Sequence, residues 1–241
     1  MADDAEVRDA QKGMFDAGRA LKRRRRGGLG AMAMPAREVP VHAETDVLVV
    51  GGGPAGVTAA VAAARTGADV VLVERYNHLG GLSTGGLVIW IDRMSDWDGR
   101  LVIRGLAEEM LDRLPADAIK GPDRALWGSR EEAAVAEWAP RASAHHGAVT
   151  WAPMIDPEWL KLSALAMVTE AGVDLMLHSW ASLPIVEDGR LAGAIVESKE
   201  GPVAIRARAV VDASGDGDMF ARAGEGTEGD VDQDNIHHCA N

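Results

Sequence analysis

One stretch of the chain, residues 45–74, restricts the possible fold more than any other. An apolar run leads into a turn with Gly51, Gly53 and Gly56, a helical stretch rich in alanine and valine follows, and a second apolar run ends on Glu74. Glycine at the three positions permits a tight turn, close approach of a pyrophosphate to the backbone, and close packing of the helix on the sheet. The pattern therefore predicts a strand–helix–strand unit that holds a dinucleotide at the helix N-terminus, where free N–H groups favour an anion.

The acidic residue at the end of the second apolar run narrows the choice of dinucleotide. Glu74 stands where an acid accepts hydrogen bonds from the hydroxyl groups of the adenosine ribose. An acid at this position, in place of an arginine, argues against a 2′-phosphate. FAD and NAD both stay open on this reasoning.

A second glycine-rich loop follows at residues 79–86, where two Gly-Gly pairs enclose Ser83 and Thr84. Glycine lets the backbone come close to a ligand, while the hydroxyl and N–H groups supply hydrogen-bond donors. We expect this loop to form a second wall of the cofactor site. His78 beside it is a candidate cofactor attachment point or base, and a plain polar loop residue is the alternative.

The remaining pattern predicts an α/β fold. Asp156 and Pro157 open a helix that ends before Gly172, and a strand follows at 173–177. Residues 182–218 predict further strands that are separated by turn residues, and the last strand leads into a loop at 213–218. These strands are expected at 182–186, 191–196, 203–207 and 209–212. The fold class is therefore a Rossmann-like parallel sheet with a GxGxxG βαβ unit and an antiparallel β-meander crossover.

Composition excludes several classes of protein. The chain has 241 residues, 47% of them hydrophobic, and a net charge of −12, which gives no general attraction to nucleic acid or to an anionic membrane. No apolar segment reaches the length of a membrane span. Cys239 is the single cysteine, which excludes an internal disulfide and a CxxC redox pair and predicts a cytoplasmic location. No spacing of histidine and cysteine is typical of a metal site, so we predict no metal.

The order of these motifs resembles the FAD-dependent oxidoreductases whose FAD domain has the two-dinucleotide fold. The closest likeness is to the family with an LGG-[LM]-[AS]-T-GG loop and a D-[AT]-[ST]-GDGD close. The matching residues cover most of the chain and lie at 47–74, 79–86, 156–177 and 210–218.

The resemblance implies FAD as the cofactor and gives each motif a part of it. The residues that it implies for the pyrophosphate and ribose are Gly51, Gly53, Pro54, Ala55, Gly56 and Glu74. Those that it implies for the adenine, the flavin side and the closing loop are Arg75, Gly80, Gly81, Ser83, Thr84, Gly85, Ala181, Ala213, Ser214, Gly215 and Asp216.

We expect four parts along the chain. Residues 1–43, with a basic tract at 22–26, are a predicted disordered leader; residues 44–224 form the FAD-binding domain. A variable insertion at about 87–155, rich in tryptophan, faces the substrate in one interpretation and caps a core in the other. Residues 225–241 form a tail. Members of the family continue beyond the GDGD motif, so a subunit of a split enzyme, a truncated product and a compact variant all stay open.

The function implied is that of an oxidoreductase in which the flavin takes a hydride at N5 from a small organic substrate. The catalytic residues stay unassigned; His78, His145 and His146 are candidate bases because imidazole changes charge near neutral pH. A second polypeptide that completes the flavin site is a possible partner. The alternatives are an NAD-dependent dehydrogenase, a thiazole-synthase-like protein and a non-catalytic partner subunit.

Overall fold

The computed structural model describes residues 32–33 and 36–225, and its helices and strands belong to one unit, Val39–Asn241. The basic tract at 22–26, Cys239 and all of the predicted tail except Glu225 lie outside the described residues. No helix in the described part of the chain is long and apolar enough to cross a membrane.

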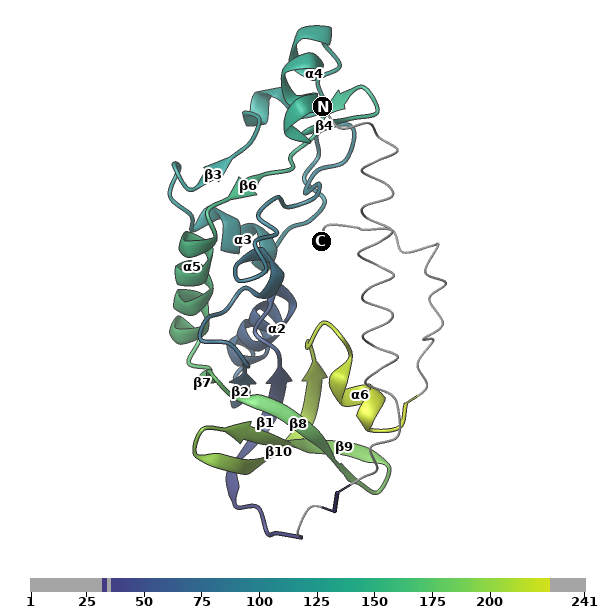
Figure 1. The fold of residues 1–241 in the computed structure, drawn as a ribbon. Coiled ribbons are helices and arrows are strands. Elements are labelled where there is room, and N and C mark those ends of the chain that lie inside the picture. Colours follow the sequence, from purple (N-terminus) through teal and green to yellow (C-terminus); the bar gives the residue numbers. More distant parts are fainter. Residues whose placement is uncertain (1–31, 34–35, 226–241) are drawn as a thin grey trace. The chain divides into compact units, whose positions relative to one another are not determined.

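A six-stranded mixed sheet forms the centre of the fold, in the order β7-β2-β1-β10-β9-β8 (Figure 1). The pairings among β7, β2, β1 and β10 are parallel, and β9 pairs antiparallel with both β10 and β8. The strands of this sheet are β1 (Val41–Val50), β2 (Val70–Val73), β7 (Asp174–Met176), β8 (Trp180–Glu187), β9 (Arg190–Ser198) and β10 (Gly201–Asp212). The predicted fold class is confirmed.

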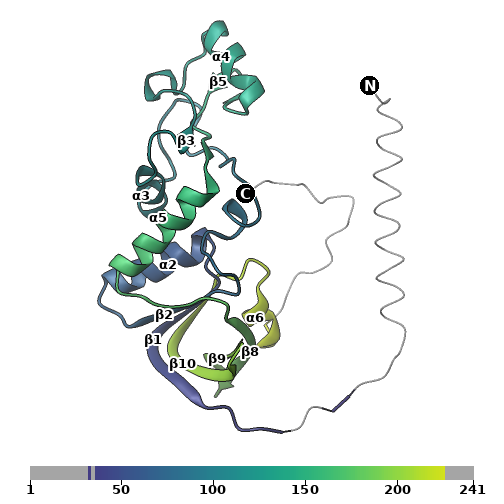
Figure 2. The same cartoon turned by 60° about the vertical axis from the view of Figure 1, so that its left-hand side comes forward.

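Helices cover one face of the parallel part. Figure 2 shows α2 (Pro54–Arg65) and α5 (Pro157–Glu170) beside each other on this face, and α3 (Leu106–Asp112) contacts both helices. The residues buried here come from these helices and from β1 and β2, whose continuous apolar runs suit strands covered on both faces. The predicted cap of α5 is present, because the Asp156 carboxylate accepts a hydrogen bond from the N–H of Glu158 at 2.8 Å.

The opposite face of β1 and β2 is covered by the meander. Buried residues of β8, β9 and β10 pack with Leu48, Val50, Val71 and Val73, and Met219 of the short helix α6 (Asp218–Arg222) completes this second core. The carboxyl ends of β1, β2 and β10 therefore lie between two packed layers, at one edge of the sheet.

The structure corrects two predicted strand boundaries. The strands expected at 203–207 and 209–212 are the single strand β10, because no turn residue separates them and Arg208 continues the extended chain. Its first half pairs with β9, while β1 pairs with it from Ala204 to Asp212. This long partner also extends β1 back to Val41, so the first strand begins inside the range assigned to the leader.

Residues 87–155 form small elements in place of one helix or sheet. The strands among them are β3 (Ile119–Lys120), β4 (Ala144–His145), β5 (Ala148–Val149) and β6 (Met154–Ile155). The helical elements besides α3 are α4 (Glu132–Trp138) and the 3₁₀ turns Arg124–Leu126 and Ala139–Arg141. Trp127 stacks on Trp151 with ring centroids 5.0 Å apart, so two of the tryptophans pack against each other.

Three elements on the helical face are joined by a chain of ion pairs. Glu109 of α3 accepts two hydrogen bonds of 2.7 Å from the Arg65 guanidinium at the end of α2. Arg113 donates to the same carboxylate at 2.8 Å and pairs with Glu170 of α5 at 2.8 Å. The hydrogen bonds from Arg65, supported by Arg113, lower the pKa of Glu109 to about 2.

We expect Glu109→Gln to destabilise the fold near neutral pH, and the difference from the wild type to shrink in acid. Because the pKa of Glu109 is lowered on folding, its contribution is complete above 4.5, the ordinary value, and is lost as the pH falls toward 2. Urea unfolding across this range measures the effect. Glu108→Gln is the control, since Glu108 pairs at 3.4 Å with Arg104, which precedes α3, and this pair does not join α3 to another helix. Equal pH dependence in both variants would contradict the role of the Arg65–Glu109 pair.

Candidate functional site

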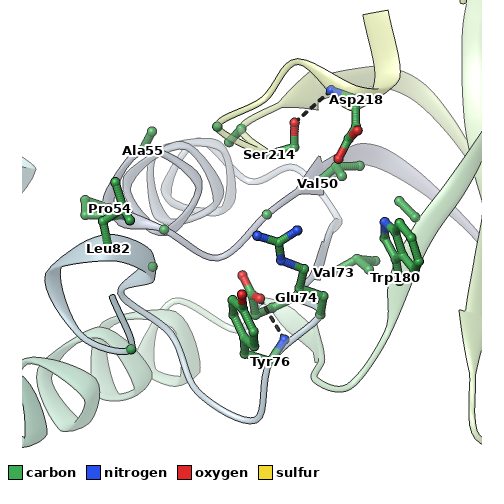
Figure 3. Close-up of a pocket in the computed structure, with 18 of the residues that line it drawn as sticks. Val50, Pro54, Ala55, Val73, Glu74, Tyr76, Leu82, Trp180, Ser214 and Asp218 are labelled. Carbon is green, nitrogen blue, oxygen red and sulfur yellow. Dashed lines mark hydrogen bonds between the residues drawn. The ribbon is translucent and has the colours of Figure 1, made fainter. Parts of the chain in front are cut away.

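A pocket of about 740 Å³ lies where β1, β2 and β10 end, within the range of small-molecule sites, about 300–1,000 Å³ (Figure 3). The last residues of β1 and β2, Val50 and Val73, line its floor together with Ala213, which follows β10. Carboxyl ends of parallel strands are the usual ligand position in open α/β sheets. The pocket is thus built by the three strands that the glycine-rich loops follow.

The turn from β1 into α2 requires glycine because three segments meet there. Gly51 has φ +100°, and a Cβ on it would overlap the carbonyl group of Ala213. A Cβ on Gly56 would overlap the carbonyl oxygen of Gly51. Gly56 therefore acts through packing, since it lets α2 start directly against the turn, and it does not line the pocket.

Gly53 has a different environment. A Cβ on Gly53 would meet nothing closer than the Cα of Gly81 at 3.9 Å, so this side of the turn opens into the pocket. Gly53 is also the N-cap of α2, no side chain caps the helix, and Pro54 occupies its first turn. The N–H groups at this helix end can therefore meet an anion that enters the open space.

Glu74 is buried, with 5% of its surface exposed, and its carboxylate already holds the backbone. Its Oε2 accepts a hydrogen bond from the N–H of Gly52 at 2.6 Å, and its Oε1 accepts one from the N–H of Tyr76 at 2.8 Å (Figure 3). Each carboxylate oxygen can accept a further bond. The predicted ribose ligand thus also fixes the glycine-rich turn to the end of β2.

The loop at 79–86 is fastened to the same turn. The N–H of Gly80 donates to the carbonyl of Gly52 at 2.8 Å, and the hydroxyl of Thr84 donates to the carbonyl of Leu79 at 2.8 Å. Neither Gly80 nor Thr84 lines the pocket, and both hold the loop in shape. Gly81, Ser83 and Gly85 of this loop do line it.

The third loop depends on Asp212, the last residue of β10. Its carboxylate accepts hydrogen bonds from the N–H of Ser214 at 3.1 Å and from the N–H groups of Met219 and Phe220 at 2.9 and 3.2 Å. Burial alone would raise the pKa of Asp212, but the hydrogen bonds from Ser214, Phe220 and Met219 together lower it. One carboxylate therefore closes the loop and holds the start of α6.

Most of the predicted site residues meet in this pocket. Those that line it are Gly51, Gly53, Pro54, Ala55, Glu74, Arg75, Gly81, Ser83, Gly85, Ala181, Ala213, Ser214 and Gly215. The predicted residues outside the lining are Gly56, Gly80, Thr84 and Asp216. Asp216 is exposed at the tip of its loop, and Asp218 lines the pocket in its place.

Several lining residues were not named individually by the sequence prediction, although Leu82 and Gly86 belong to the loop at 79–86 that was expected to form a wall of the site. They are Val50, Val73, Tyr76, Leu82, Gly86, Ser179, Trp180 and Asp218. Figure 3 shows Tyr76 with Glu74 across the pocket from Asp218, and Trp180 on the β8 side. Most of these residues directly neighbour predicted ones, which is the signal that could have found them.

The three candidate histidines divide into two groups. His78 lines the pocket. His145 and His146 do not; they lie on the hairpin of β4 and β5, where their rings contact Trp97. Within residues 36–225, no group of three or more His, Cys, Asp or Glu side chains is arranged to hold a metal ion, and the absence of a metal stays a prediction.

Comparison with known proteins places this arrangement among flavoproteins. A family model described as "FAD dependent oxidoreductase" matches residues 46–238, most of the chain. The chain is 31% identical over 188 residues to the thiamine thiazole synthase of Aeropyrum pernix, covering 72% of this chain and 56% of that protein. It is 30% identical over 205 residues to digeranylgeranylglycerophospholipid reductase 1 of Methanopyrus kandleri, covering 82% of this chain and 46% of that protein.

A solved structure shares the fold. The geranylgeranyl bacteriochlorophyll reductase-like protein of Thermoplasma acidophilum aligns with a TM-score of 0.50 at 24% identity, covering 76% of this chain and 42% of that one. This likeness concerns the fold alone. The chain spans about half the length of the curated relatives that it matches.

We expect Asp212→Asn to loosen the loop at 213–217 and the start of α6. An amide cannot accept hydrogen bonds at both of its atoms, so at least one of the three N–H bonds is lost, at a cost of about 1–3 kcal/mol. Hydrogen exchange at the amides of Ser214, Met219 and Phe220 measures the opening directly. Asp216→Asn is the control because Asp216 is exposed and outside the pocket lining. Equal loosening by the control would show that charge in the loop, and not the bonds of Asp212, holds α6.

Proposed function

The chain belongs to the FAD-dependent oxidoreductase family, whose cofactor is FAD, and we propose that the pocket at the ends of β1, β2 and β10 holds this cofactor. The observation that carries the proposal is the open side of Gly53 beside the uncapped N-terminus of α2. A group with a pyrophosphate fits these residues, because the backbone can be approached closely and presents N–H donors there.

We assign the parts of the cofactor as follows. The pyrophosphate lies against Gly51, Gly53 and the first turn of α2, which includes Pro54 and Ala55. A hydroxyl group of the adenosine ribose donates a hydrogen bond to a remaining lone pair of the Glu74 carboxylate.

The adenine lies between the chain after β2 and the start of β8. Arg75, whose guanidinium is 5.0 Å from the ring centre of Tyr76, lies on one side, and the backbone of Ala181 lies on the other. The loop at 213–215 closes over the cofactor from the end of β10.

The activity proposed is oxidation or reduction of a small organic substrate. Bound FAD would supply hydride transfer at flavin N5, and the residues of this chain bind and orient the cofactor. We propose that the segment at 87–155 is the substrate-facing part of the domain 44–224. The backbone bridge between Trp90 and Met154 lies where this segment leaves and re-enters the domain. A cytoplasmic location and a second polypeptide at the flavin are further proposals, and no relative supports the second polypeptide.

One alternative has a specific observation in its favour. Identity of 31% to a thiamine thiazole synthase is similar to the 30% identity to digeranylgeranylglycerophospholipid reductase 1 of Methanopyrus kandleri, so a thiazole-synthase-like activity on a bound dinucleotide is the second candidate. Purified chain separates the two functions. Visible flavin absorbance, with FAD released on heating, supports the oxidoreductase; a colourless, folded protein that carries an adenylated product supports the alternative.

We expect Gly53→Ala to lower the affinity for FAD and Gly51→Ala to lower the stability of the fold. Gly53 has φ −67° and open space around it, so alanine preserves the fold, while its methyl group separates the pyrophosphate from the backbone. FAD affinity should fall about tenfold or more, which is ~1.4 kcal/mol. Gly51→Ala should destabilise the protein itself by about 1–3 kcal/mol, because its φ of +100° disfavours any side chain and Ala213 leaves no room.

Thermal unfolding of the cofactor-free variants and titration with FAD measure the two effects separately. A Gly53→Ala variant that folds and binds FAD as tightly as the wild type would place the pyrophosphate elsewhere.

A further inference from the structure

His78 is a titratable side chain of the pocket whose role the cofactor assignment leaves open. It follows β2 by a few residues, is partly buried, and lines the pocket beside the loop at 79–86. Its ring is parallel to that of Tyr76, with centroids 5.8 Å apart and an interplanar angle of 10°. The imidazole therefore stacks on one neighbouring ring and is not a freely rotating surface group.

One ring nitrogen is committed to the protein. Nδ1 of His78 lies 3.2 Å from the carbonyl oxygen of Leu79 and 3.4 Å from the hydroxyl oxygen of Thr84. The Thr84 hydroxyl donates its own proton to the same Leu79 carbonyl at 2.8 Å. Because a carbonyl oxygen only accepts, these partners assign the proton of the neutral imidazole to Nδ1.

The other nitrogen, Nε2, is then an acceptor. Among the described residues it has no hydrogen-bond partner. A Cβ on Gly85 would lie 2.8 Å from Nε2 and 2.6 Å from Cε1, so a side chain at position 85 would collide with the imidazole ring. Gly85 itself lines the pocket. Glycine at position 85 thus makes room for the imidazole of His78 at the wall of the pocket.

We propose that His78 is a binding residue whose Nε2 accepts a hydrogen bond from a hydroxyl group of bound FAD, with its tautomer fixed by the Leu79 carbonyl. The inference rests on the proposed function, because it needs FAD in this pocket. FAD carries hydroxyl donors along its sugar and sugar-alcohol chains, and His78 lines the pocket in which FAD would lie. His78 acts on the bound ligand, and Thr84 and Gly85 position His78.

Two substitutions of His78 distinguish the roles of its two ring nitrogens. In His78→Asn the amide reaches the position of Nδ1, so the contact with the Leu79 carbonyl can form but the pocket-facing acceptor is lost. In His78→Gln the amide reaches the position of Nε2, so an acceptor is kept while the contact with Leu79 is lost. His42→Asn is the matched control, since His42 is exposed on β1 and does not line the pocket.

The measurement is the dissociation constant of FAD for the full chain by quenching of flavin fluorescence, with urea unfolding of each cofactor-free protein alongside. We expect His78→Asn to bind FAD about tenfold more weakly with little change in stability, and His78→Gln to bind more tightly than His78→Asn. The opposite order, or wild-type affinity in His78→Asn, overturns the role of Nε2 and leaves the FAD site standing. Failure of the wild-type chain to bind FAD overturns both proposals.

Discussion

The close approach of three backbone segments at Gly51, Gly56 and Ala213 is the constraint on which the rest of the structure depends. A side chain on either glycine would overlap a neighbouring carbonyl group, so the end of β1, the start of α2 and the loop after β10 can meet only with glycine there. Their meeting point fixes where the helix N-terminus points. It also sets the position of the pocket, because the other two loops fasten to this turn or to the strands beside it.

Two carboxylates extend this constraint to the whole edge of the sheet. Glu74 at the end of β2 and Asp212 at the end of β10 both accept hydrogen bonds from backbone N–H groups of the loops that follow or face them. Hydrogen bonds to a charged acceptor are stronger than those between neutral groups. The loops of the pocket are therefore held by the protein itself, and a ligand would meet a wall that is largely formed in advance, which reduces the entropy cost of binding.

The parts of the fold and of the site that could be predicted from the sequence are those set by the spacing of residues close together in the chain. The glycine positions in the first turn follow from the backbone of one strand–helix junction, and the cap of α5 follows from Asp156 and Pro157. The continuity of β10 could not be read, because it depends on pairing with β1, more than 150 residues away in the sequence.

The roles of the loop residues could not be predicted from the sequence either. Thr84 was predicted as a ligand, yet its hydroxyl bonds to a backbone carbonyl of its own loop, which only the folded loop reveals. His145 and His146 share with His78 the chemistry of imidazole, and only the tertiary fold separates them, because it puts one at the pocket and two on a distant hairpin beside Trp97. Residue type thus predicts what a side chain can do, while its contacts decide what it does.

Residues 87–155 join the rest of the domain through their two ends. Their two ends run together as a stem, residues 89–94 and 151–155, held by backbone hydrogen bonds such as Ile91 N–H to Pro153 O at 2.8 Å and Met94 N–H to Trp151 O at 2.7 Å. The first segment of the stem, 89–94, follows the loop at 79–86, and the second, 151–155, leads into α5. Backbone bonds of this kind tolerate many side chains, so the segment beyond the stem can change in sequence without disturbing the loop that lines the pocket.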